Sequence, residues 1–403
     1  MNNGDFVTKV ANVGKKKVAE ESINRVLSAA KRKGKVLGLN IALAAIVAFG
    51  FSSLAFAASA PNAAEWEKTV AAAKKEGVVS VIGPLGAEMR NALTLAFQRK
   101  YPDIKIEFQG FTGSQVGPKL IAELTAGRNT TDVLIVGTTT ALEALLPAKA
   151  LVPVKPFLSG PNTQDPSKWR GGKLTFTDEA QSYNLVFSQY VKAPFYYNSQ
   201  QVSETDFKSW KDLLEPKWQG KIALRDPTIS GGSVGTVLLW YTHPDLGKDF
   251  IRNFFALKDL ALPRDDRQML DFTTRGKYNL VIGPNDPMAT EFISRGLPLK
   301  QLRPETLKEG SYITTGNGSL VIPRGAPHPN ALRVYVDFFL SPEGQLEFSK
   351  AGVVASLRRD VPKDHVPDVL VPKEGTPYID LSAEKYISAR KEVTRFVKTI
   401  MPH

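Results

Sequence analysis

The sequence contains no cysteine in its 403 residues. That absence excludes disulfide bonds, thiolate metal sites, cysteine nucleophiles and the lipidated cysteine that tethers many exported proteins. Histidine is scarce as well, and it occurs only at positions 243, 328, 365 and 403. There is no H-x-x-x-H motif and no clustered His/Asp/Glu spacing typical of a metal site, so we expect no metal site. Nucleotide fingerprints are also missing, because Gly316-Asn-Gly318 lacks the third glycine of a dinucleotide motif and no P-loop occurs.

The length exceeds what one ordinary hydrophobic core supports and indicates two lobes. A hydrophobic fraction of 42% and a mean hydropathy of -0.17 are typical of a globular protein. The formal net charge is +12, and residues 1–57 contribute half of it through nine basic and three acidic residues. A mildly basic surface steers anionic solutes. No basic run with interleaved aromatic residues follows residue 57, so we expect no nucleic-acid binding.

The N-terminal segment has the features of a secretory signal. A basic cluster at residues 31–35 precedes an apolar run over 36–51, and the small-x-small pattern Ala55-Phe56-Ala57 follows. We expect cleavage after Ala57, because the alternative after Ala60 would leave Pro61 at the new N-terminus. An uncleaved anchor helix is the other interpretation, since residues 36–57 would just span a bilayer of about 20 apolar residues.

After residue 57, helical and strand periodicities alternate, which predicts an α/β fold. In the first part of the chain, the periodicity predicts helices over 63–76, 87–100 and 116–125 and strands over 78–82, 104–108 and 132–136. In the second part, it predicts strands over 222–224, 280–282 and 319–323 and helices over 233–241, 250–257 and 330–340. This rhythm predicts a parallel sheet with helices on both faces. Residues 151–181 are the longest irregular stretch.

The order of several segments matches a known pattern. The most specific are residues 209–222, SWKDLLEPKWQGKI, and residues 323–331, PRGAPHPNA. Residues 66–84, WEKTVAAAKKEGVVSVIGP, and 131–146, TDVLIVGTTTALEALL, agree with it. Together they resemble the periplasmic substrate-binding proteins of ABC transporters, in the branch that contains the ferric-ion binders.

The resemblance implies a type II periplasmic binding fold, an α/β architecture of two lobes joined by crossing strands with the ligand in the cleft between them. One lobe would comprise residues 58–190 plus 312–345, and the other 191–311 plus 346–403. It also implies a monomeric, non-enzymatic periplasmic protein without a cofactor, which hands a small-molecule or oxyanion ligand to a membrane ABC permease. A sensor that signals to a membrane receptor is an open alternative.

In open α/β sheets, ligands bind beyond the carboxyl ends of the strands, in the loops that lead to helices. Small residues in such loops let backbone N–H groups approach a ligand, and helix N-termini favour anions. The strongest candidate is Ser230-Gly231-Gly232-Ser233, which opens a predicted helix. The alternative is an ordinary helix cap, for which serine is among the best residues. The other loop candidates are Gly83, Gly113, Ser114, Thr138, Thr139, Asn285 and Asp286.

Two further side chains are candidates, each with a structural alternative. Arg225 follows a predicted strand and offers a bidentate clamp for an oxyanion, unless it pairs with Asp226 or another acid. Tyr197 lies where the resemblance implies a cleft tyrosine, unless it packs in the hinge or core. For Asn285 and Asp286 the alternative is turn chemistry before Pro287.

Ferric iron is the nearest alternative ligand. The resemblance implies adjacent tyrosines after the strand over 280–282, but Gly-Pro-Asn-Asp follows it. Residues 83–87 lack histidine and residues 137–140 lack a carboxylate, while Tyr196-Tyr197, expected on a crossing strand, supplies at most one ligand. We therefore expect a small polar, anionic solute.

A serine hydrolase is the alternative from another class. Residues 231–235 match G-x-S-x-G around Ser233, and Asp337 and His365 follow in the required order. The nucleophile elbow places its serine directly after a strand, however, and residues 225–228, which include Pro227, intervene here. We therefore expect no enzymatic activity.

Overall fold

The computed structural model describes residues 63–229, 232–373 and 378–401. The predicted signal segment and cleavage site, as well as Ser230 and Gly231, lie outside these residues. Within them, no helix is long and apolar enough to cross a membrane.

The first sheet has the strand order β2-β1-β3-β13-β6-β5, with β4 paired to β13. Its strands are β1 (Val78–Gly83), β2 (Lys105–Gly110), β3 (Val133–Val136), β4 (Leu151–Val152), β5 (Thr175–Phe176), β6 (Leu185–Val186) and β13 (Ser319–Pro323). β1 is parallel to β2 and β3, whereas β13 is antiparallel to β3, β4 and β6. The prediction of a parallel sheet is therefore wrong for half of it, because β13 returns from the second block in the opposite direction.

Helices cover both faces of this sheet, as predicted. They are α3 (Ala63–Glu76), α4 (Ala87–Lys100), α5 (Gly113–Thr125), the π-helix η1 (Thr140–Leu145), α10 (Pro329–Phe339) and α11 (Pro342–Gly352). Val79 and Val81 of β1 belong to one buried cluster and Ile82 to another, so alternate residues face opposite helix layers. α5 begins three residues earlier than predicted, since Thr112 and Gln115 form a capping box there.

The second sheet has the order β11-β8-β10-β9. Its strands are β8 (Tyr196–Asn198), β9 (Ile222–Leu224), β10 (Leu280–Ile282) and β11 (Leu299–Gln301). The surrounding helices are α6 (Gly232–Thr242), α7 (Gly247–Phe255), α8 (Asp266–Thr274) and α9 (Asp286–Ser294). β9 and β10 are parallel, so the loops after both strands leave the same edge of the sheet.

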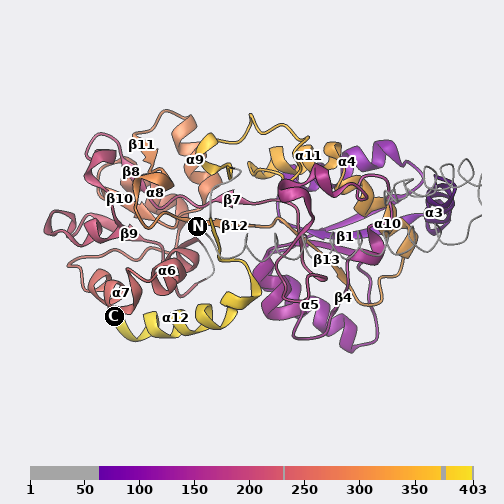
Figure 1. Cartoon of the computed structure of the whole chain (residues 1–403), viewed down its shortest axis with the longest axis horizontal. Helices are drawn as coiled ribbons and strands as arrows, with labels where there is room; N and C mark the ends of the chain where they lie inside the picture. The colour runs from indigo at the N-terminus through magenta and orange to yellow at the C-terminus, as the bar shows by residue number, and fades with distance from the viewer. Residues whose placement is uncertain (1–62, 230–231, 374–377, 402–403) are drawn as a thin grey trace, which may run out of the picture. The chain divides into compact units, whose positions relative to one another are not determined.

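A three-stranded sheet connects the two parts, and Figure 1 shows β7 and β12 running from one sheet toward the other. It consists of β7 (Tyr190–Val191), β12 (Tyr312–Thr314) and β14 (Ile379–Asp380). The last helix, α12 (Ile387–Ile400), belongs to both lobes: Ile387 packs against a core cluster of the first lobe, while Val393 and Val397 belong to that of the second.

Two details of the predicted lobes need correction. Tyr196 and Tyr197 lie in β8 of the second sheet and not on a crossing strand. The boundary after residue 345 is too early, because Phe348 and Leu357 pack in the core of the first lobe.

Further short helices interrupt the remaining described chain, including the irregular stretch over 151–181. They are η2 (Lys155–Phe157), η3 (Pro166–Lys168), η4 (Arg170–Gly172), η5 (Glu204–Asp206), η6 (Trp210–Leu214), η7 (Pro216–Trp218), η8 (Pro304–Thr306), η9 (Asp368–Leu370) and η10 (Glu384–Tyr386).

Candidate ligand-binding site

A cavity of about 910 Å³ is lined by both lobes and by the strands that connect them. The first lobe contributes residues 137–140, the second lobe 284–286, and the connecting strand β12 and its loop 312–317. The C-terminal segment adds residues of α12 and the turn before it. A cavity of this size accommodates a small molecule.

Three α-helices begin at this cavity. Gly113 is the first residue of α5, Gly232 the first of α6 and Asp286 the first of α9, and all three line the wall. The first N–H groups of a helix have no partner within the helix, and the helix dipole places partial positive charge there. Helix ends from both lobes therefore favour negative charge in the cavity.

A buried ion pair forms part of the wall on the second lobe. Lys192 Nζ lies 2.6 Å from Asp286 Oδ2 and donates a second hydrogen bond, of 2.7 Å, to the Pro284 carbonyl. Tyr196 Oη donates to Asp286 Oδ1 at 2.8 Å. The side chains of Lys192 and Asp286 are only 2% and 1% exposed. Both carboxylate oxygens of Asp286 are therefore already occupied by protein groups.

Tyrosines surround this pair as neutral phenols. Burial, followed by the negative charge of Asp286, holds the pKa of Tyr190 and of Tyr196 well above the ordinary value. Burial likewise raises the pKa of Tyr312, whose Oη donates to the Gly232 carbonyl at 3.0 Å. At neutral pH all three side chains are therefore phenols rather than phenolates, and Tyr190 and Tyr312 line the cavity.

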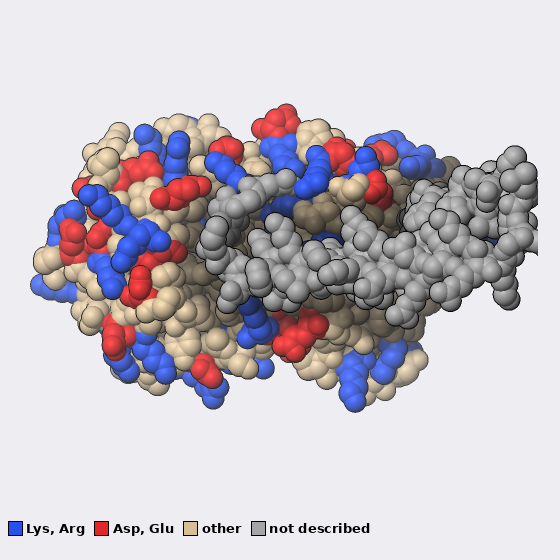
Figure 2. All heavy atoms as spheres, in the orientation of Figure 1, with Lys and Arg blue, Asp and Glu red and all other residues tan. Residues whose placement is uncertain are grey.

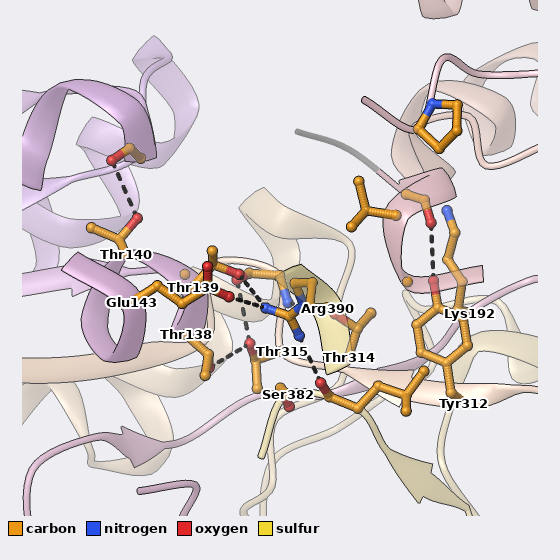
Figure 3. Close-up of a pocket in the computed structure, with 18 of the residues that line it drawn as sticks. Thr138, Thr139, Thr140, Glu143, Lys192, Tyr312, Thr314, Thr315, Ser382 and Arg390 are labelled. Atoms are coloured by element: carbon orange, nitrogen blue, oxygen red, sulfur yellow. Dashed lines mark hydrogen bonds and ion pairs between the residues drawn. The ribbon is translucent and has the colours of Figure 1, made fainter. Parts of the chain in front are cut away.

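The opposite wall is rich in hydroxyl groups and contains an arginine from α12 (Figure 3). Thr138 Oγ1 lies 2.9 Å from Thr315 Oγ1 and is part of a buried hydroxyl network. Arg390 donates through Nη1 to Glu143 Oε1 at 2.8 Å and to Thr139 Oγ1 at 3.0 Å. Arg390 thus joins the C-terminal helix to the first lobe at the cavity.

The positive and negative charges of the residues that line the cavity do not cancel. Four carry positive charge and two carry negative charge: Lys192, Arg390, Lys391 and Arg395 against Glu143 and Asp286. Each of the two carboxylates is engaged in an ion pair with a lining cation. The two remaining positive charges raise the local concentration of anions.

The structure brings together six of the residues that the sequence predicted. Gly113, Thr138, Thr139, Gly232, Asn285 and Asp286 all line the cavity. Asn285 also caps α9, since its side chain accepts a hydrogen bond from the Met288 backbone, so the alternative of local turn chemistry holds too.

Five predicted residues do not line this cavity, each for an identifiable reason. A Cβ on Gly83 would lie 2.7 Å from Leu93 Cδ1, which makes this glycine a packing residue. Ser114 is exposed and contacts Thr112, at 3.1 Å between their hydroxyl oxygens. Tyr197 is buried in the core of the second lobe.

The other two are an arginine and a serine. Arg225 Nε lies 3.1 Å from Asp266 Oδ1, so this arginine forms an ion pair with an acidic side chain, which was the structural alternative to a ligand contact. Ser233 is fully buried, and its Oγ has no hydrogen-bond partner among the described residues. A ligand contact by Ser230 or Gly231 stays a prediction outside the described residues.

Sequence reasoning missed the cations of the site. Lys192 had a usable signal, because it is the one charged residue between Tyr183 and Tyr197 and such a lysine is often buried with a partner. Arg390, Lys391 and Arg395 had none. Their helix reaches the cavity only through tertiary packing.

The side chains that a serine hydrolase would need do not form a catalytic triad in the part of the chain that the structure describes. His365 Nε2 lies 2.8 Å from Ser349 Oγ, and His328 Nδ1 lies 2.9 Å from Asp132 Oδ2. Asp337 accepts hydrogen bonds from Asn162. Within residues 63–229, 232–373 and 378–401 no three metal-ligating side chains of the His, Cys, Asp or Glu type cluster together.

Asp226 makes the loop before α6 sensitive to acid. Burial opposes its ionisation, but hydrogen bonds from Thr228 and the charge of Arg264 outweigh this and hold its pKa below the ordinary value. A lowered folded-state pKa stabilises the protein above about pH 3.9, and this contribution is lost as the pH falls through the folded pKa.

We therefore expect the free energy of unfolding, measured between pH 6 and pH 3, to fall less steeply in Asp226→Asn than in the wild type. The variant would also be less stable than the wild type at pH 6. Identical pH profiles would show that this carboxylate does not hold the loop.

Comparison with known proteins decides the family. A family model of bacterial extracellular solute-binding proteins matches residues 80–346. The chain belongs to this family. It is a solute-binding protein of the kind that acts outside the cytoplasmic membrane. A search of curated protein sequences found no significant match.

Solved structures share the fold of this solute-binding protein. IdiA (FutA) of Trichodesmium, in complex with iron and citrate, has a TM-score of 0.61 and 16% identity over 80% of this chain and 99% of its own. AfuA of Actinobacillus pleuropneumoniae, with fructose-6-phosphate, has a TM-score of 0.57 and 21% identity over 81% and 99%. Iron-bound HitA of Pseudomonas aeruginosa has a TM-score of 0.59 and 16% identity over 80% and 99%. AfuA is a periplasmic binding protein, and the likeness in fold to all three structures confirms the predicted two-lobed α/β architecture.

Proposed function

We propose that this protein is the periplasmic component of an ABC importer and that it binds a small polar anion in the cavity between its lobes. It acts as a monomer without enzymatic activity and delivers the solute to a membrane permease. The signal segment over 1–57 supports export, and the family supports the transport role.

The anionic character of the ligand rests on one observation. Three helix N-termini and two excess positive charges line the same cavity, and both carboxylates in its wall are already paired. An anion there gains from the helix dipoles and from the cations, and it meets no unpaired carboxylate among the described lining residues. A cation would meet the opposite field.

Iron is the ligand of two structural relatives, but the donor set here favours another solute. Ferric iron requires several hard oxygen donors, and those nearest Lys192 are the paired Asp286 and phenols whose pKa is raised by burial. The buried ammonium would also repel the ion. The fructose-6-phosphate of AfuA is closer in chemistry to what this cavity favours.

Nucleic acid is not the partner that the surface favours. Figure 2 shows basic and acidic side chains interspersed on the face that it presents. A nucleic-acid interface concentrates lysine and arginine in one patch or stripe.

Thermal melting tests the proposal. We would measure the melting temperature with carboxylates, phosphonates, phosphate esters, polyamines and ferric salts. At 100 times its Kd a specific ligand stabilises the fold by about 2.7 kcal/mol, which gives a visible shift. We expect at least one anion to raise the melting temperature while its neutral analogue does not. A shift with ferric salts or polyamines alone would contradict the proposal.

A further inference from the structure

We propose that the ligand carries two anionic groups, one at each end of an uncharged polar body. This rests on the proposed anion-binding function and specifies its substrate class. The cations of the cavity lie at two poles on different walls: Lys192 with its partner Asp286 is at one, and the unbalanced charges of α12 are at the other. In Figure 3, Lys192 lies beside Tyr312, whereas Arg390 lies with Thr139 and Glu143.

The first pole is the ammonium of Lys192. Two of its three N–H groups are bound, to Asp286 and to the Pro284 carbonyl, which leaves one donor for a ligand. A Cβ on Gly232 would lie 2.6 Å from Nζ, so the missing side chain at the start of α6 keeps the space beside the ammonium open. The helix N-terminus adds to the positive potential there.

The second pole is on α12. Lys391 and Arg395 are exposed at the cavity, one helical turn apart, and neither forms an ion pair with an acidic side chain among the described residues. Arg390, in the same turn, is already held by Glu143. Lys391 and Arg395 therefore account for the two positive charges that the wall does not balance.

Hydroxyl groups, not charges, line the remaining polar surface. Thr138, Thr139, Thr314, Thr315, Ser382 and Thr394 contribute them. Such groups bind an uncharged hydroxylated chain and offer no partner for a third charge. The chemistry of the walls therefore fits a hydroxylated dianion better than a compact ion.

Four six-carbon probes with similar backbones separate the possibilities by calorimetric Kd. Glucarate has a carboxylate at both ends, gluconate at one end and glucitol at neither. Glucitol 6-phosphate has about the charge of glucarate but carries it at one end. A hydrogen bond to a charged group contributes about 1.5–3 kcal/mol, so we expect glucarate to bind at least tenfold more tightly than gluconate and glucitol 6-phosphate.

The variant Lys391→Gln/Arg395→Gln should remove most of this preference, because it weakens the binding of glucarate much more than that of gluconate. Lys385→Gln/Lys398→Gln is the matched control, because it removes two exposed charges of the same C-terminal segment that do not line the cavity. Equal affinities for glucarate and gluconate, or an unchanged preference in the first variant, would overturn the two-group inference and leave anion binding intact. If no anion bound in this experiment and none raised the melting temperature, both proposals would be overturned.

Discussion

Replacing Lys192 by methionine is expected to lower the free energy of unfolding by about 3–5 kcal/mol, because it leaves Asp286 charged and buried without its partner. Both side chains are almost completely excluded from solvent, and besides that ion pair the carboxylate accepts a hydrogen bond from Tyr196. Urea denaturation of the purified variant measures the loss.

Two further variants serve as a rescue and a control for this result. Lys192→Met/Asp286→Asn should recover much of the lost stability, since no uncompensated charge stays buried. Lys300→Met, at an exposed lysine of β11 outside the cavity, should change stability by less than about 0.5 kcal/mol. If Lys192→Met cost no more than this control, the buried ion pair would not be a determinant of stability.

The second large effect concerns the contact between the loop after β10 and the start of α6. Gly283 has a φ of 75°, and a Cβ there would lie 2.6 Å from both the N and the Cα of Ser233. Alanine would combine left-handed backbone strain with overlap against backbone atoms that cannot rotate away. We expect Gly283→Ala to lower the free energy of unfolding by about 2–4 kcal/mol and to weaken ligand binding, since Gly232 moves with Ser233.

Gly296→Ala is the matched control for this prediction. Gly296 has the same φ of 75°, but no heavy atom lies within 4 Å of the position of its Cβ. The free energy of unfolding of Gly296→Ala should fall by about 1–2 kcal/mol, because only backbone strain contributes, and ligand affinity should not change. Equal losses in the two variants would mean that the contact with α6 contributes nothing.

Much of the fold and part of the site followed from local pattern. The strands β1, β3, β9 and β10 are short apolar runs bounded by glycine, proline or polar residues. The loops after β3, β9 and β10 line the cavity, as expected at the carboxyl ends of strands in α/β sheets. For this reason the sequence predicted the loop residues Thr138, Thr139 and Gly232, which the structure places at the cavity. Periodicity also located six of the ten described α-helices to within three residues, whereas α8, α9, α11 and α12 were not predicted.

The remaining site residues depend on contacts that are distant in sequence. Arg390 reaches Glu143 across 247 positions, and Lys192 reaches Asp286 across 94. The direction of β13 likewise follows from where the chain re-enters the first sheet. Tyr197 was misplaced because alternate residues of β8 face different cores, and Tyr196, not Tyr197, points to the Lys192 pair.

Calorimetric titration of the anion that gives the largest melting shift tests the central claim most directly. The wild-type protein should bind one equivalent, while folded Lys192→Met/Asp286→Asn should bind at least tenfold more weakly, because it lacks the ammonium at the cavity wall. Lys300→Met should bind like the wild type. Equal affinities in all three proteins would place the anion outside this cavity and contradict the proposed site.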